Sequence, residues 1–256
     1  MIRKHILILI GVILSCGYIS AQVLVQTIDD AHTGNVIALD ANSTGSLIVS
    51  GGIDNRAHLW NANAGQKIKS FSDTEGYPSV AFRSDGKKFV TSSYSGKLII
   101  WDTESQKPVT MLKGNTSDIL NLAINQVNNN IAGGGKDGKI VIWNQEGKML
   151  YNFIAHSGEI IKCAFNVKGS ELISATNSEI KIWDCNNFNL LKTIIPESKS
   201  VKALNISYNL DKIAIVTGNR KVEIWNTDTY TKDADIPQTK HDIVSVEFSP
   251  DDRFLA

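Results

Sequence analysis

The chain has 256 residues and a mass of 28.0 kDa, and its 42% hydrophobic and 20% charged residues are typical of a globular protein. Its 26 lysines and arginines balance 26 aspartates and glutamates, so the formal net charge is zero. Proteins that bind nucleic acids usually carry a basic surplus that attracts phosphates, and we therefore expect no nucleic-acid partner.

The first 21 residues have the pattern of a secretory signal peptide. Two basic residues precede the apolar run Ile6–Leu14, and Ala21 supplies a small residue before the cleavage point. The apolar run is shorter than the roughly 20 residues that a membrane-spanning helix needs, so we expect no membrane span. We expect residues 1–21 to be removed and residues 22–256 to be exported, as a periplasmic, cell-surface or secreted protein.

Cys16 leaves one alternative open for this N-terminal segment. The segment 13–16 reads Ile-Leu-Ser-Cys and resembles a bacterial lipobox, in which the cysteine becomes the lipidated first residue of a tethered protein. The segment lacks a leucine three residues before the cysteine. We therefore favour a free exported protein over one with a lipid anchor at Cys16.

Five tryptophans recur at a period near 40 residues, and they are all the tryptophans of the chain. They are Trp60, Trp101, Trp143, Trp183 and Trp225, at intervals of 41, 42, 40 and 42 residues. Each one ends a short segment rich in apolar and β-branched residues, continuous before Trp101 and Trp143 and alternating with polar residues before the others, which predicts a strand. A period of about 40 residues with turn residues between the strands predicts a repeat architecture of four-stranded sheets.

The same four strands follow one another within each period. An apolar strand such as 36–41 leads through a turn to a second strand such as 47–50. A tight hairpin then leads to the strand that ends in tryptophan, and an outer strand such as 67–71 completes the set. The alternation of apolar and polar residues is lost at Ile99 and Val141, which indicates sheets buried on both faces. We therefore predict an all-β chain.

These residues resemble the WD-repeat β-propeller family. Trp101-Asp102 and Trp183-Asp184 contain the dipeptide that gives the family its name, and asparagine follows the other three tryptophans. The segments 47–54 and 248–251 are similar to the family's inner-strand and hairpin motifs. The resemblance covers residues 22–256 and implies a β-propeller of four-stranded antiparallel blades, with five complete blades and part of a sixth.

The sixth repeat leads us to expect a truncated chain. It begins at 243–248 and the sequence stops inside its second strand, while the strand at 23–27 has no earlier blade to join. The resemblance implies seven blades, with a leading strand that completes the last one. We therefore expect an incomplete C-terminus, which would leave sheet edges unpaired.

The resemblance also implies a hydrogen-bond relay within a blade, which links a loop histidine, a strand hydroxyl, a turn carboxylate and the tryptophan. The first repeat supplies His32, Ser50, Asp54 and Trp60. The fourth repeat nearly matches, with His156, Ser174, Asn177 and Trp183. Buried polar groups need partners, so such a network locks the strands together. The second, third and fifth repeats lack one or more of these residue types, and we expect their relays to be broken.

We identify no catalytic, cofactor-binding or metal-binding residues in the sequence. The glycine-rich segment Gly133–Ile140 fits a phosphate-loop pattern, but a strand follows it and no serine or threonine follows the lysine, which favours a hairpin turn. The five histidines show no metal-ligand spacing. We therefore expect no enzyme, no metal and no cofactor.

The resemblance implies a non-catalytic platform or scaffold for a protein or peptide partner. Such partners would dock where the hairpin turns meet the loops that enter the first strands. The residues of this candidate interaction face are Asn35, Ile53, Tyr94, Asp118, Lys136 and Glu159. Two alternatives stay open: a propeller enzyme, and a regulatory or targeting propeller of a longer protein with a catalytic domain beyond residue 256.

Overall fold

The structure is a computed structural model, and it describes most of the chain. The described residues are 6–10, 23–28, 31–72, 79–94, 96–114, 117–208, 211–249 and 251–256, with only the backbone described in 6–10 and 23–26. None of the described residues belongs to a helix that is long and apolar enough to cross a membrane. The chain divides into two compact units, Met1–Val109 and Thr110–Ala256.

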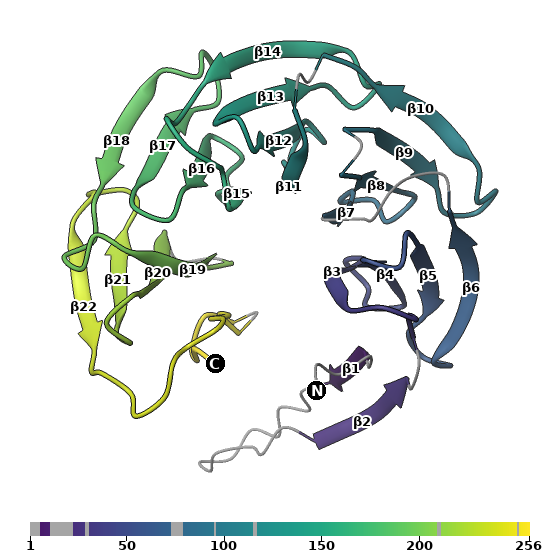
Figure 1. The fold of residues 1–256 in the computed structure, drawn as a ribbon, viewed down its shortest axis with the longest axis horizontal. Coiled ribbons are helices and arrows are strands. Elements are labelled where there is room, and N and C mark those ends of the chain that lie inside the picture. The colour runs from purple at the N-terminus through teal and green to yellow at the C-terminus, as the bar shows by residue number, and fades with distance from the viewer. Residues whose placement is uncertain are drawn as a thin grey trace. The chain divides into compact units, whose positions relative to one another are not determined.

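The first unit contains the first two of five four-stranded sheets (Figure 1). The first sheet has the order β3 (Val36–Ala41), β4 (Leu47–Gly52), β5 (Ala57–Asn61) and β6 (Gln66–Phe71). The second has the order β7 (Val80–Phe82), β8 (Lys88–Ser92), β9 (Leu98–Asp102) and β10 (Pro108–Leu112), and the boundary between the units falls within β10. Consecutive strands pair, as the predicted hairpins require.

The second unit contains the other three sheets. They are β11 (Ile119–Ile124), β12 (Ile131–Gly135), β13 (Lys139–Trp143) and β14 (Met149–Ile154); β15 (Lys162–Phe165), β16 (Glu171–Ala175), β17 (Ile180–Asp184) and β18 (Leu190–Ile194); and β19 (Val201–Ile206), β20 (Lys212–Thr217), β21 (Val222–Asn226) and β22 (Lys232–Ile236). Within this unit the first strands β11, β15 and β19 lie on one side and the last strands β14, β18 and β22 on the other (Figure 1). The prediction of five complete antiparallel blades is confirmed.

Two further strands precede the repeats. β1 (Ile6–Ile10) pairs antiparallel with β2 (Val23–Ile28). β1 lies within the predicted signal peptide, and the other residues of that segment, Cys16 included, lie outside the described residues. The removal of residues 1–21 and the lipidation of Cys16 stay predictions.

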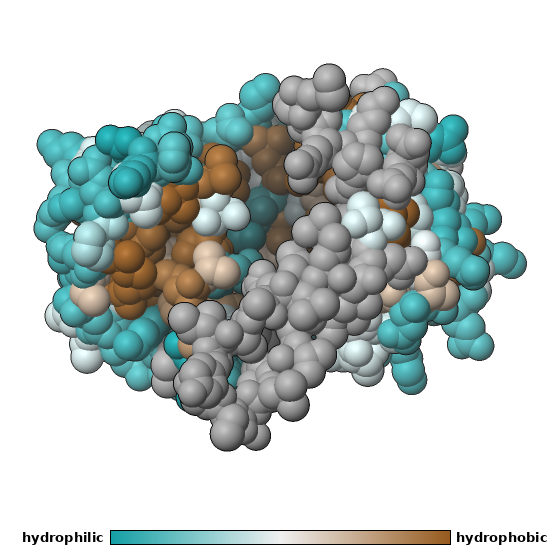
Figure 2. Space-filling view, turned by 90° about the horizontal axis from the view of Figure 1, so that it is seen from below, coloured by the Kyte–Doolittle hydropathy of each residue, from teal (hydrophilic) through white to brown (hydrophobic). Residues whose placement is uncertain are grey.

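A sixth hairpin begins after the fifth sheet. Phe248 and Leu255 form an isolated antiparallel bridge, and Val246 and Phe248 pack against apolar residues of β20 and β21. Val244 and Phe254 in the same segment are 88% and 64% exposed. Figure 2 shows apolar residues gathered on the side of the second unit where the fifth sheet lies.

The apolar cores lie between neighbouring sheets of one unit. Leu59 of the first sheet packs in one cluster with Phe89 and Trp101 of the second. Ile182 of the fourth sheet packs in another cluster with Ile213 of the fifth. The side chains of Leu59, Phe89, Ile182 and Ile213 are fully buried, and burying one large apolar side chain stabilises a fold by about 1.5–3 kcal/mol. Sheets buried on both faces explain why the apolar alternation is lost in the sequence.

Polar side chains also join the first strand of one sheet to the following repeat. In each case a side-chain oxygen accepts a hydrogen bond from a main-chain N–H that lies 42 or 43 residues later. The pairs are Asp40 with Phe82 (2.7 Å), Asn121 with Cys163 (2.7 Å) and Asn205 with Phe248 (3.1 Å). The repeat period is therefore also the spacing of a contact between sheets.

Candidate functional site

The four relay residues predicted in the first repeat are in contact. His32 lies in the loop before β3, and its Nδ1 is 2.9 Å from Asp54 Oδ1 in the β4–β5 turn. His32 Nε2 is 2.8 Å from Ser50 Oγ on β4, and the indole N–H of Trp60 on β5 donates to the same oxygen at 2.8 Å. A carboxylate only accepts, so His32 Nδ1–H donates to Asp54 and Nε2 accepts from the Ser50 hydroxyl. The relay runs in one direction, from tryptophan to carboxylate.

The carboxylate of Asp54 is held at both oxygens. The Thr33 N–H donates to Asp54 Oδ2 at 2.8 Å, and the Thr33 hydroxyl lies 3.3 Å from the same atom. Burial raises the pKa of Asp54, but the hydrogen bonds from His32 and Thr33 outweigh burial and hold this pKa below its ordinary value. Asp54 is therefore ionised at neutral pH.

A second histidine, His58, lies beside this relay. It belongs to β5, is 2% exposed, and its ring centroid is 4.3 Å from that of His32. Its Nδ1 is buried and has no hydrogen-bond partner among the described residues. Sequence reasoning missed this contact, although the strand period gave a signal: residues 58 and 60 are two apart, so both face Ser50.

The fourth repeat forms the same relay with a different carboxylate. His156 Nε2 is 2.7 Å from Ser174 Oγ, which also accepts the indole N–H of Trp183 at 2.8 Å. His156 Nδ1 donates to Glu179 Oε1 at 2.8 Å, and not to Asn177, which is exposed in the turn. The prediction of Asn177 was therefore wrong. The longer glutamate side chain reaches back to the histidine from the residue before β17.

Lys181 completes the fourth relay with a positive charge. It stands two residues before Trp183, as His58 stands two before Trp60. Its Nζ is 3.1 Å from Glu179 Oε1 and donates to the Ala155 carbonyl at 2.9 Å. Burial raises the pKa of Glu179, but the hydrogen bonds from His156 and Lys181 outweigh burial and lower it. The carboxylate is thus shared between a neutral donor and a cation.

The other three tryptophans find partners outside a histidine relay. The indole N–H of Trp101 donates to the Thr91 hydroxyl at 2.9 Å, so the second repeat keeps the contact between tryptophan and strand hydroxyl. The indole N–H of Trp143 donates to the Lys113 carbonyl at 2.7 Å. That of Trp225 donates to Glu223 at 2.9 Å. Each indole N–H is therefore satisfied, as a buried donor requires.

The residues of the candidate interaction face lie in loops and turns at strand ends. The Ile53 N–H donates to the Asn35 carbonyl at 3.1 Å, and the Lys136 N–H donates to the Asp118 carbonyl at 3.0 Å. In the first and third sheets the hairpin turn therefore contacts the loop that enters the first strand. Ile53 and Tyr94 are 50% and 44% exposed, Lys136 and Glu159 are exposed, and Asn35 and Asp118 are half-buried.

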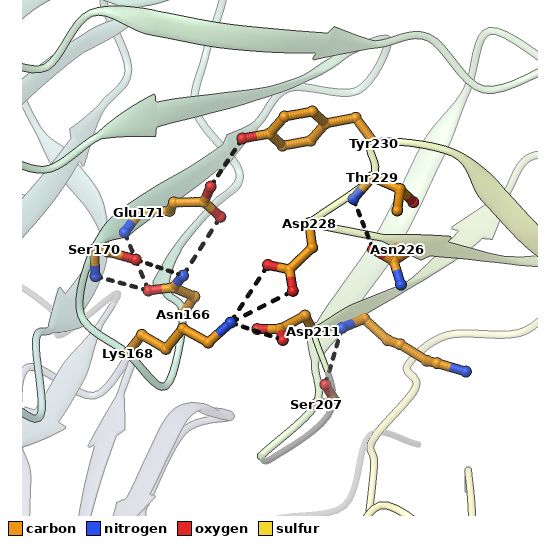
Figure 3. Close-up of polar contacts among 11 residues, drawn as sticks. Asn166, Lys168, Ser170, Glu171, Ser207, Asp211, Asn226, Asp228, Thr229 and Tyr230 are labelled. Carbon is orange, nitrogen blue, oxygen red and sulfur yellow. Dashed lines mark hydrogen bonds and ion pairs between the residues drawn. The ribbon is translucent and has the colours of Figure 1, made fainter.

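A cluster of charged residues joins the fourth and fifth sheets within the second unit (Figure 3). Lys168 Nζ lies 2.9 Å from Asp211 and 3.4 Å from Asp228. The Tyr230 hydroxyl donates to Glu171 Oε1 at 2.9 Å. Burial raises the pKa of Glu171, and burial together with the Glu171 contact raises that of Tyr230 to about 12. These groups form hydrogen bonds and ion pairs with one another, so the cluster connects the two sheets.

The remaining candidates for chemistry have structural positions. Gly133–Ile140 spans the end of β12, a turn and the start of β13, which is a hairpin without a helix. Burial raises the pKa of the Cys163 and Cys185 thiols to about 12. Thiols with such a pKa stay protonated at neutral pH and are poor nucleophiles and metal ligands.

Comparison with known proteins gives one family and several distant relatives. Four stretches, 22–61, 65–102, 106–144 and 147–184, match WD40, described as "WD domain, G-beta repeat". The chain is 20% identical over 202 residues to Autophagy-related protein 16 of Arabidopsis thaliana, which is 78% of this chain and 40% of that protein. It is 22% identical over 178 residues to Target of rapamycin complex subunit wat1 of Schizosaccharomyces pombe (68% and 56%). It is 28% identical over 145 residues to Small ribosomal subunit protein RACK1y of Oryza sativa subsp. japonica (53% and 43%). The chain thus spans about half the length of these relatives.

Proposed function

The chain belongs to the WD40 repeat family, and from this premise we propose that it is a non-catalytic platform that binds a protein or peptide partner. The observation that carries the proposal is the contact of Ile53 with Asn35 at one end of the first sheet. This contact holds the turn in place while half of the Ile53 side chain stays exposed. An apolar side chain on an ordered turn is a suitable anchor for a partner.

Two of the relatives support a role in assemblies. Their names describe a subunit of the target of rapamycin complex and a protein of the small ribosomal subunit. Fold alone does not determine function, so the proposal for this chain depends on its own exposed residues.

The test is quantitative cross-linking of the full chain to its partners with a double variant, Ile53→Ser with Tyr94→Ser. We expect captured partners to fall at least about tenfold, the effect of losing about 1.4 kcal/mol of binding free energy. The matched control is Val127→Ser with Val167→Ser, which changes two turn residues that are 66% and 49% exposed elsewhere. Equal capture by the wild-type chain and both double variants would remove this face as the docking site.

We also propose that the chain is exported, and the support is the pattern of residues 1–21. The test is expression with its own N-terminus, followed by cell fractionation and the intact mass of the product. Export with cleavage predicts a mature chain that starts at Gln22 outside the cytoplasm. A cytoplasmic chain that keeps residues 1–21 would contradict it, and a lipidated Cys16 would replace the free form by the tethered one.

A further inference from the structure

We propose that His32, Asp54 and His58 form a binding site for a divalent transition-metal ion of the zinc type. The three side chains each offer one ligand atom, and these atoms lie within 4.8 Å of one another. Imidazole nitrogens and a carboxylate oxygen are ligands that Zn²⁺ prefers. Three protein ligands leave a fourth position for water or for a group from a partner.

The buried nitrogen of His58 is the first observation behind the proposal. His58 is 2% exposed, and its Nδ1 has no hydrogen-bond partner among the described residues. The relay through His32, Ser50 and Trp60 does not use His58. Because buried polar atoms are nearly always paired, this unpaired nitrogen requires an explanation, and a metal ion supplies one.

The other two ligands are already oriented by outer contacts. Asp54 Oδ2 is held by Thr33, which leaves Oδ1 toward His32. The Nε2 of His32 is held by Ser50, which leaves Nδ1. Metal-binding histidines usually donate a hydrogen bond from their second nitrogen, so on metal binding the His32 proton would move from Nδ1 to Nε2 and Ser50 Oγ would accept it. Nδ1 and Oδ1 are 2.9 Å apart, whereas two ligands of a tetrahedral zinc ion lie about 3.3 Å apart with bonds of about 2.0–2.1 Å. A small opening would let the ion lie between Nδ1 and Oδ1, while the proton of this pair is carried by Nε2.

Gly52 keeps space free beside the same two atoms. A Cβ at this position would lie 2.5 Å from His32 Nδ1 and 2.6 Å from Asp54 Oδ1. The φ angle of Gly52 is not in the left-handed region, so backbone conformation alone does not require glycine here. A metal ion can therefore reach both ligand atoms only because residue 52 has no side chain.

The fourth sheet shows which charge the first sheet lacks at this position. Lys181 places an ammonium group 3.1 Å from the carboxylate of Glu179. In the first sheet the matching residue is His58, which places an imidazole, and not an ammonium group, beside the carboxylate. A bound ion would supply there the positive charge that Lys181 supplies in the fourth sheet.

The test is titration of the metal-stripped full chain with Zn²⁺ by calorimetry, together with thermal unfolding with and without zinc. We expect the wild-type chain to bind one more equivalent of Zn²⁺ than His58→Leu, and only the wild-type melting temperature to rise with zinc. Loss of the ligand should weaken binding at this site by about 100-fold or more, since loss of outer contacts alone costs about 10–100-fold. His241→Gln, a change at an exposed histidine, should keep the additional equivalent.

A second variant and a spectrum keep the test independent of folding defects. Gly52→Ala keeps all three ligand residues in the sequence, but its Cβ would displace His32 Nδ1 and Asp54 Oδ1, and it should also lose the additional equivalent. The X-ray absorption spectrum of the zinc-loaded chain should show nitrogen and oxygen ligands only. Equal zinc binding by the wild-type chain and His58→Leu, no zinc binding by the wild-type chain, or sulfur ligands in the spectrum would each overturn the proposal.

Discussion

The relays of the first and fourth sheets share a tryptophan, a serine and a histidine, and they differ in the carboxylate and in the residue beside it. In both, a serine hydroxyl accepts from a tryptophan and lies 2.7–2.8 Å from a histidine. The first relay ends at Asp54 with His58 beside it, and the fourth ends at Glu179 with Lys181 beside it. The comparison teaches that the hydroxyl fixes the geometry, while the residue two positions before the tryptophan sets the local charge.

Loss of the shared hydroxyl should have the largest effect, and an equal effect in both sheets. Ser50→Ala and Ser174→Ala each leave a buried indole N–H and a buried imidazole nitrogen without a partner. We expect each variant to lose about 2–4 kcal/mol of unfolding free energy. Urea unfolding followed by tryptophan fluorescence measures this, with the exposed Ser157→Ala as control. A loss of less than about 0.5 kcal/mol in either variant would show that the hydroxyl does not hold the relay.

Loss of the cation in the fourth sheet should come next in size. Lys181→Leu removes the partner of Glu179 and of the Ala155 carbonyl. Because the lysine side chain is 19% exposed, solvent screens part of the interaction, and we expect a loss of about 1–2 kcal/mol. Denaturant midpoints measure the loss, and Lys192→Leu on the exposed side of β18 is the matched control. Equal midpoints for the two variants would show that the contacts of Lys181 with Glu179 and Ala155 do not stabilise the fold.

Acid should destabilise the fourth relay by a smaller amount. Burial lowers the pKa of His156 below 6.5, although the hydrogen bond to Glu179 opposes this, and Lys181 adds to the lowering. Below pH 6.5 the unfolded chain therefore binds more protons than the folded chain, and the unfolding free energy falls as the pH falls. His156→Gln should flatten this slope between about pH 6.5 and 5, where Glu179 stays ionised. A slope that is unchanged in denaturation curves over this range would contradict the assignment.

Loss of His58 should have the smallest effect, and the opposite sign to loss of Lys181. In the presence of a chelator, His58→Leu removes a buried unpaired nitrogen and replaces it with an apolar group of similar size. We expect a change of between zero and about 1 kcal/mol, in the stabilising direction. Thermal and urea unfolding measure it. A loss above about 2 kcal/mol would show that His58 has a polar partner in the metal-free fold.

The period of the tryptophans predicted the fold, and the resemblance to the WD-repeat family implied the four residues of the first relay. Trp60 and its four counterparts mark the third strand of every sheet, and the turns between them follow from glycine, asparagine and aspartate. The carboxylate of the fourth relay could not be predicted in the same way. The shorter hairpin moves the residue at the aligned position, Asn177, out of reach, and a side chain one methylene longer takes its place from Glu179.

The contact of His58 with His32 could have been predicted from the sequence, but only by combining the strand that holds His58 with the loop that holds His32. The strand period places His58 on the same face as Trp60, and the relay places His32 there too. Neither residue alone indicates a metal ligand, because their separation in sequence matches no short ligand motif. Only the pairing of β4 with β5 and the position of the loop before β3 bring the two rings together.

The hydrogen bonds from Asp40, Asn121 and Asn205 to the following sheet have one further consequence, for proton exchange with solvent. The amide protons of Phe82, Cys163 and Phe248 are protected by a side chain from a neighbouring sheet. Their exchange rates therefore report on whether two sheets are docked, separately from whether either sheet has formed. Three resonances in an NMR spectrum would follow the order in which the repeats separate.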